Sequence, residues 1–99
     1  MYLKADSQTK FTEKLEKVII PLLRLQHGFK DEIALVISSG RKAVAISLWD
    51  KKENAEAYNS VKYPEVLKDL AEIIEGIPQV ETYEVSNSTW HKIAAPIAA

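Results

Sequence analysis

The side chains most able to do chemistry in this chain are aromatic, and a histidine lies beside one of them. They are Trp49, Tyr58, Tyr63, Tyr83 and Trp90, and His91 follows directly after the last. Large aromatic side chains usually fill a core or an interface, and that is the simpler interpretation of all of them. The alternative is an apolar pocket in which tyrosine hydroxyls and an imidazole act on a bound molecule. The sequence pattern leaves both interpretations open.

Metal and phosphate sites are not indicated. The chain has no cysteine, and its histidines, His27 and His91, lie too far apart to form a ligand motif. Its glycines, Gly28, Gly40 and Gly76, are too widely spaced for a phosphate-binding loop. We therefore expect neither a metal nor a cofactor.

The composition is that of one small globular domain. The chain has 99 residues, of which 46% are apolar and 27% charged, and its net charge is −1. This balance argues against binding to nucleic acid or to an anionic membrane, since both favour a basic excess. The start lacks the pattern of a signal peptide, and the longest apolar run, at residues 18–23, is too short for a membrane span. We expect a single cytoplasmic domain over residues 1–99, with an extended C-terminal segment at 87–99.

The first helix is expected to follow the capping residues Asp6 and Ser7. Pro21 should kink it, because proline lacks an N–H and clashes with the carbonyl four residues earlier. Gly28 should end it. The residues expected to face the core recur at helical spacing and are Phe11, Leu15, Val18, Leu22 and Leu25, with Ile19 and Leu23 widening the stripe.

The second helix is expected to follow Asp50, which has Glu53 three residues later in the pattern of a capping box. The pair Tyr63–Pro64 should interrupt this helix, since the residue before proline avoids helical geometry. Its second part should end at Gly76, and its apolar residues are Val66, Leu67, Leu70, Ile73 and Ile74.

Strands are expected on both sides of these helices. The chain begins with a short apolar stretch at residues 1–5, and residues 33–38 and 42–49 form a pair joined by a short turn. Residues 80–85 should be a fourth strand, and residues 89–94 a fifth extended piece. The order β-α-β-β-α-β predicts an α+β, ferredoxin-like fold.

Both faces of the expected sheet are rather apolar, although an antiparallel sheet with one exposed face should alternate apolar with polar residues. On residues 42–49, one face carries Val44, Ile46 and Leu48, and the other carries Ala43, Ala45, Ser47 and Trp49. The two helices cover one face only, so we expect a homodimer in which a second sheet covers the other. RNA-recognition modules share this topology, but the central strands here lack their stacking aromatics.

One passage carries a family resemblance. Residues 47–58 read SLWDKKENAEAY, which is a strand ending in Leu-Trp, an acidic cap and a helix with the pattern E-x-A-x-x-Y. Residues 21–29 read P-L-L-x-x-x-x-G-F. Both resemble the antibiotic-biosynthesis-monooxygenase-like family of dimeric α/β barrels, and the element order agrees over residues 1–86. The resemblance implies a homodimer, and it implies cofactor-independent oxygenation of polycyclic phenols or quinols, haem degradation, or no known activity.

The haem-degrading branch of that family does not match this chain. Its members resemble one another in an Asn on the first strand, a Trp in the second helix and, shortly afterwards, a haem-ligating His. The first strand here has no Asn, Tyr58 stands at the Trp position, and the His position falls near Leu67 or Lys68. No imidazole is available there for iron, so we do not expect haem.

The remaining branch assigns roles to the aromatic residues. In a cofactor-independent oxygenase the substrate carbanion reduces oxygen, and the protein supplies an apolar pocket, a base and hydrogen-bond donors. We expect Tyr58 to be the donor and His91 the base, with substrate bound by Trp49, Tyr63, Tyr83 and Trp90. The pair Asp31–Glu32 is an alternative source of the base, although carboxylates at a strand edge usually only improve solubility.

Two further interpretations do not involve turnover. The first is a dimeric ligand-binding or stress-related protein with the same pocket. The second is an interaction module whose aromatic residues fill its own core.

Overall fold

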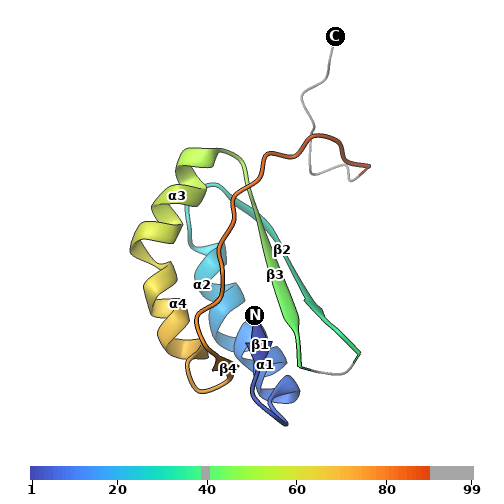
Figure 1. Ribbon diagram of the computed structural model, residues 1–99. Helices are drawn as coiled ribbons and strands as arrows, with labels where there is room; N and C mark the ends of the chain where they lie inside the picture. The colour runs from blue at the N-terminus through green and yellow to red at the C-terminus, as the bar shows by residue number, and fades with distance from the viewer. Residues whose placement is uncertain (39–40, 90–99) are drawn as a thin grey trace.

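The computed structural model of the chain describes residues 1–38 and 41–89 and has an α+β fold (Figure 1). Two helical stretches lie beside a long β-hairpin, and a short strand pair includes the first residues of the chain. Among the described residues, no helix is long and apolar enough to cross a membrane.

The first helical stretch contains a π-helical turn. It consists of α1 (Gln8–Lys14), η1 (Leu15–Ile19) and α2 (Ile20–Arg24). The N–H of Ile20 donates to the carbonyl of Leu15, five residues earlier, and Pro21 lies in the first turn of α2. The wider turn therefore comes immediately before the proline, where an ordinary α-helix would bring its ring against a carbonyl.

The π turn changes which residues face the core. The buried residues of this stretch are Phe11, Leu15, Ile19 and Leu23. All four belong to the predicted stripe, but Val18 is 38% exposed and Leu25 85% exposed, so the stripe is wrong at those two positions. The π turn takes up about one more residue than an α-helical turn, and this moves the inward positions forward by one.

Ser7 lies at the N-cap of α1, as predicted, but its side chain does not bond to the helix. The hydroxyl donates to the carbonyl of Ala5. Asp6 has a left-handed backbone with a φ of 57°. The chain thus turns sharply between the first strand and the helix.

The second helical stretch is divided where the sequence predicts. Helix α3 (Lys52–Val61) and helix α4 (Tyr63–Leu70) meet at Lys62, and Pro64 lies in the first turn of α4. The predicted capping box is wrong. Lys51 occupies the N-cap position, and no side chain caps the helix.

The β-hairpin is the longest element. Strands β2 (Phe29–Val36) and β3 (Ala43–Trp49) pair antiparallel, with Ile33 opposite Ile46 and Leu35 opposite Val44. The predicted pair is confirmed, although β2 begins four residues earlier than expected.

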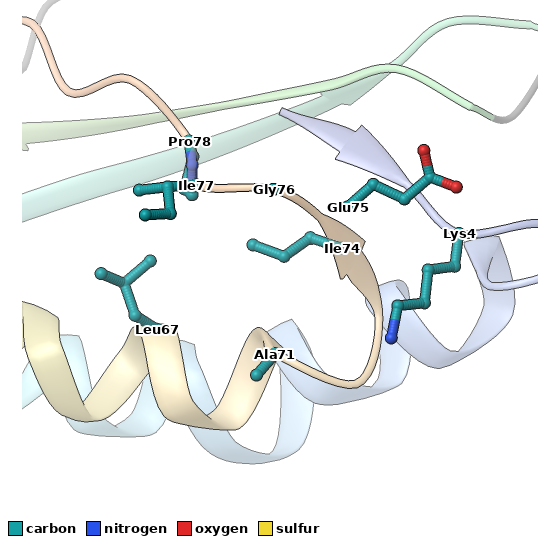
Figure 2. Close-up of a pocket in the computed structure, with 8 residues that line it drawn as sticks. All are labelled: Lys4, Leu67, Ala71, Ile74, Glu75, Gly76, Ile77 and Pro78. Atoms are coloured by element: carbon teal, nitrogen blue, oxygen red, sulfur yellow. The ribbon is translucent and has the colours of Figure 1, made fainter.

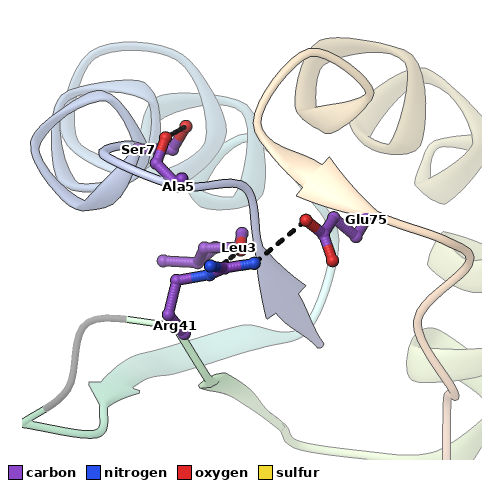
Figure 3. Close-up of polar contacts among 5 residues, drawn as sticks. All are labelled: Leu3, Ala5, Ser7, Arg41 and Glu75. Atoms are coloured by element: carbon purple, nitrogen blue, oxygen red, sulfur yellow. Dashed lines mark hydrogen bonds and ion pairs between the residues drawn. The ribbon is translucent and has the colours of Figure 1, made fainter.

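The first strand and the last strand form a second pair. Strand β1 (Tyr2–Leu3) pairs antiparallel with β4 (Ile74–Glu75), and Tyr2 also forms an antiparallel bridge with Lys42, just before β3. Figure 3 shows how Arg41 links these strands: its Nε donates to the Leu3 carbonyl at 2.8 Å, and its Nη2 lies 3.0 Å from Glu75 Oε1. Leu3, at the centre of this junction, is fully buried.

The fourth strand lies earlier in the chain than predicted. The sequence pattern places it at residues 80–85, but those residues form no strand, and β4 is Ile74–Glu75. Helix α4 correspondingly ends at Leu70 rather than continuing to Gly76. Ile73 and Ile74 are 4% and 5% exposed, so two large apolar side chains are buried at and next to β4, whereas Val80, Tyr83 and Val85 stay exposed. Of the predicted piece at 89–94, residue 89 has no regular structure and the rest lies outside the described residues.

The hairpin has one face toward the helices and one face away from them. Ala43 is buried and Trp49 packs against the core, so the face that they share is the inner one. The outer face is apolar and exposed, as the pattern predicts: its exposed residues are Leu35 (53%), Ile37 (52%), Val44 (46%) and Ile46 (40%).

Candidate functional site

The inner face of the hairpin meets a row of aromatic rings. Phe29 on β2 contacts Trp49 on β3 edge to face, with ring centroids 5.5 Å apart. Trp49 in turn lies 5.1 Å from Tyr58 on α3, and Tyr58 lies 6.2 Å from Tyr63 on α4. We call these residues the aromatic cluster: Phe29, Trp49, Tyr58 and Tyr63. It joins the hairpin to both parts of the second helical stretch.

A carboxylate lies on the same face, and a β-bulge adds Phe29 to it. Phe29 pairs with Trp49, and Glu32 pairs with Ser47, so β2 has one more residue than β3 over this interval. The extra residue is Lys30, where the register shifts. Without a bulge, positions 29 and 32 would point to opposite faces; with it, Glu32 shares the face of the aromatic cluster.

Glu32 is held by a short hydrogen bond. The Ser47 hydroxyl donates to Glu32 Oε2 at 2.6 Å, directly across the strand pair. Burial raises the pKa of Glu32 from 4.5 to about 7, and the bond from Ser47 opposes part of that rise. A carboxyl with a pKa near 7 is present in both protonation states at neutral pH, which is the property of an effective general base.

Among the rings of the cluster, Tyr58 is the one whose pKa is affected by the charge of Glu32. Burial raises the pKa of Tyr58 well above its ordinary value, and the negative charge of Glu32 adds to the rise. Burial also raises the pKa of Tyr63. Both hydroxyls therefore keep their protons at neutral pH and remain hydrogen-bond donors.

Solvent reaches this face along the hairpin. Ala34 and Ala45 lie opposite each other next to the pair Glu32–Ser47, on the same face, and both are exposed. Because these side chains are small, the Glu32 carboxylate is accessible from the end of the hairpin where β2 and β3 are joined. Tyr58, by contrast, is only 7% exposed and forms the inner end of the site.

The structure brings together some of the predicted site residues and separates another. Trp49, Tyr58 and Tyr63 lie together in the aromatic cluster. Tyr83 is 78% exposed, and its hydroxyl donates to the carboxylate of Glu81 instead of facing the cluster. The predicted residues Trp90 and His91 lie outside the described residues.

Sequence reasoning gives too little weight to Glu32 and does not include Phe29. The sequence pattern favours an exposed carboxylate at a strand edge for Glu32, yet its position has the same parity as Ala34 and Val36, which share the inner face. That parity is the signal that could have found it. The bulge that adds Phe29 to the same face has no comparable signal in the sequence.

A separate depression lies between α4 and β4 (Figure 2). It is lined by Lys4, Leu67, Ala71, Ile74, Glu75, Gly76, Ile77 and Pro78. The lining is mostly apolar and contains none of the aromatic cluster. Its charged groups are Lys4 and Glu75, and Glu75 is paired with Arg41.

No three metal-ligating side chains gather among residues 1–38 and 41–89. Comparisons with known proteins found no matching family model, no matching curated protein and no matching solved structure.

Proposed function

We propose that this chain binds a small aromatic molecule beside Glu32 and the aromatic cluster, and that it oxygenates a phenol or quinol without a cofactor. The observation that carries the proposal is the Glu32 carboxyl, whose pKa is raised to about 7 on the face that also carries the cluster. Aromatic rings bind an aromatic ligand by stacking, and a carboxylate among them accepts a phenolic proton. The resemblance of residues 47–58 to the antibiotic-biosynthesis-monooxygenase-like family supports the same assignment.

The first step of the reaction is a proton transfer. Glu32 takes the proton of the phenol, and the resulting negative charge is shared between the oxygen and a ring carbon. The Tyr58 hydroxyl, which keeps its proton, donates a hydrogen bond to the phenolate oxygen. Glu32 thereby takes the role that the sequence assigns to His91.

The second step uses the electrons of the substrate. The charged ring carbon reduces O₂ and forms a C–O bond, and Glu32 returns its proton to give a hydroperoxide. The O–O bond then breaks with loss of water, which removes the ring C–H hydrogen and leaves a carbonyl. One oxygen atom enters the product and the other enters water, so no external reductant is required.

We also propose a ferredoxin-like arrangement that pairs as a dimer. The antiparallel contacts of β4 with β1, of Tyr2 with Lys42, and of β3 with β2 support the strand order β4-β1-β3-β2. Backbone bonds from Leu3 to Arg41 (2.7 Å) and from Ala43 to Met1 (2.9 Å) support the central contact. The exposed apolar outer face supports a second copy as its cover.

A non-catalytic ligand-binding protein is the second candidate. The observation in its favour is the packing of the rings: Tyr58 is 7% exposed and lies between Trp49 and Tyr63. In this case the cluster stabilises the fold and borders a binding surface, and Glu32 selects ligands without transferring a proton.

Oxygen uptake with a panel of phenols and quinols separates the two candidates. We expect turnover by the unaltered chain, and a decrease of about 10²–10⁴-fold for Glu32→Gln, which cannot accept a proton. Glu53→Gln, which removes an exposed carboxylate from the first turn of α3, is the matched control and should be unchanged. Tyr58→Phe should lower turnover as well.

Native mass spectrometry of the same variants shows whether binding survives. Binding of a phenol without oxygen uptake would favour the non-catalytic candidate. Full turnover in Glu32→Gln would mean that the base has been assigned wrongly.

A further inference from the structure

The depression between α4 and β4 lies apart from the aromatic cluster and is lined mainly by aliphatic side chains. Its volume is about 550 Å³, and small-molecule sites commonly measure roughly 300–1,000 Å³. Leu67 of α4, Ile74 of β4 and Ile77 border the same space (Figure 2). Among the described residues that line it, none is aromatic. Stacking on a ring is therefore not available here, and the lining suits an aliphatic ligand better than an aromatic one.

Part of this apolar lining is open to solvent. Ile77 is 89% exposed, and a Cβ added to Gly76 would meet no atom within 4 Å. A ligand that covers Ile77 would remove a large apolar side chain from water, which is favourable. The depression thus has both the room and the exposed apolar surface that an aliphatic ligand needs.

One cation determines the charge of the depression. Lys4 directly follows β1, and its N–H donates to the Ile73 carbonyl at 2.7 Å, which fixes its backbone beside β4. Within residues 1–38 and 41–89, the Lys4 amine has neither an ion pair nor a side-chain hydrogen bond.

The other charged group of the depression is already neutralised. Glu75 Oε1 lies 3.0 Å from Arg41 Nη2 (Figure 3). The aliphatic lining is therefore combined with a single available positive charge, that of Lys4, and charge complementarity favours a ligand with a single negative charge.

We propose that this depression binds an aliphatic monocarboxylate of the fatty-acid type, with its hydrocarbon chain against Leu67, Ile74 and Ile77 and its carboxylate at the Lys4 amine. The carboxylate gains a charge-assisted hydrogen bond, and the chain covers apolar surface. This site is separate from Glu32 and the aromatic cluster, so the inference goes beyond the proposed function and does not depend on it.

An NMR titration of the ¹⁵N-labelled chain with butanoate, hexanoate and octanoate, each below the concentration at which it forms micelles, tests the aliphatic part of the site. We expect saturable shifts of the amide signals of Leu67, Ala71 and Gly76, which line the depression. Affinity should rise by up to about fourfold for each added methylene group, because each one is removed from water.

Lys4→Gln tests the charge, since glutamine keeps much of the length of the side chain and removes the cation. We expect it to weaken octanoate binding by about two- to fivefold, the range for an exposed ion pair, and to leave the binding of octanol unchanged. Lys10→Gln, which removes an exposed lysine from α1 outside the depression, is the matched control and should change neither.

Ala71→Leu tests the location. Ala71 lines the depression and is exposed, so a larger side chain there occupies space that the ligand needs. We expect octanoate binding to weaken at least about tenfold. Ala57→Leu makes the same substitution at an exposed position of α3 that does not line the depression, and it should bind octanoate as the unaltered chain does.

Saturable octanoate binding that is weakened by Lys4→Gln and Ala71→Leu, but by neither control, supports the proposal. Equal affinities for octanoate and octanol, or octanoate binding that is unchanged in Lys4→Gln, would overturn the assignment of a carboxylate ligand. Shifts confined to the signals of Glu32 and Ser47, or no saturable shift at all, would overturn the site itself. None of these outcomes involves oxygen uptake, so the proposed function and this site succeed or fail separately.

Discussion

Among single residues, Glu32 is the one on which the proposed function most depends. Its carboxyl is shielded from much of the solvent and accepts a hydrogen bond from the Ser47 hydroxyl. It has no cationic partner among the described residues. This arrangement disfavours the ionised form. If this side chain served only the stability of the fold, a neutral residue at position 32 would give a more stable protein. The stabilities of the unaltered chain and of a neutral variant can be compared directly.

We expect Glu32 to lower the stability of the fold as the pH rises. Because its pKa is raised from 4.5 in the unfolded chain to about 7 in the folded one, the native state binds more protons between these values. The contribution of Glu32 protonation to the free energy of unfolding is fully present below about pH 4.5 and is lost as the pH rises through 7. The full shift corresponds to roughly 3 kcal/mol, and partial solvent screening reduces the effect to about 1–2 kcal/mol.

Glu32→Gln should therefore stabilise the protein at pH 8 by about 1–2 kcal/mol, and should change its stability little at pH 4. Urea denaturation at the two pH values measures the difference, with Glu53→Gln as the control for loss of an exposed carboxylate. Equal effects of Glu32→Gln at both pH values would contradict the burial of this carboxyl.

At the scale of elements, the turn from α2 into β2 positions the aromatic cluster. Gly28 has a φ of 79°, and its carbonyl accepts the Asp50 N–H at 2.9 Å. A Cβ at this position would lie 2.2 Å from Asp50 Oδ1 and 2.4 Å from Asn54 Nδ2, which bond to each other at 2.7 Å. Glycine is needed here both for its backbone conformation and for this close approach.

We expect Gly28→Ala to destabilise the fold by about 2–3 kcal/mol, from left-handed backbone strain and from displacement of the pair Asp50–Asn54. Gly76→Ala is the matched control, because Gly76 has a similar φ of 69° but a Cβ there would meet no atom within 4 Å. Gly76→Ala should lower the stability through backbone strain alone, by about 1 kcal/mol. Urea denaturation compares the two, and equal losses would show that the close approach is unimportant.

The order of elements can be read from the sequence, but some of their positions cannot. Local patterns identify the hairpin, the break at Tyr63–Pro64 and both helical stretches. The stripe of the first helix includes the buried Ile19 and Leu23 but is wrong at Val18 and Leu25, because a π turn before Pro21 shifts the register and no periodicity reveals it. Strand β4 is misplaced because VETYEV has strong strand propensity, whereas Ile74–Glu75 is chosen by tertiary burial next to Leu3.

The candidate site is predictable in part for similar reasons. Trp49, Tyr58 and Tyr63 are identified because their residue types and elements place them together. Glu32 is underestimated because carboxylates at a strand edge usually face solvent, although its parity with Ala34 and Val36 places it on the inner face.

At the scale of the whole molecule, the exposed outer face of the hairpin predicts self-association. Leu35, Ile37, Val44 and Ile46 lie on one continuous face of β2 and β3 and are each at least 40% exposed. Burying such a face in a second copy removes apolar area from water, and a charge placed there would oppose it.

We expect Leu35→Lys to convert a dimer into a monomer in sedimentation measurements while leaving the circular dichroism spectrum unchanged. Val61→Lys is the matched control, since Val61 is 66% exposed on α3, outside this face. A dimer that tolerates Leu35→Lys as well as Val61→Lys would place the interface elsewhere.

The proposed function depends above all on Glu32 accepting a proton at neutral pH beside the aromatic cluster. The most direct test is an NMR pH titration of the chain with ¹³C-labelled glutamate side-chain carboxyl groups, in which the Glu32 signal is assigned by its loss in Glu32→Gln. We expect the Glu32 signal to titrate with a midpoint of about 7. A midpoint for Glu32 near 4.5 would contradict the claim, because the carboxyl would then be an ordinary solvated group and no longer the base of the proposed reaction.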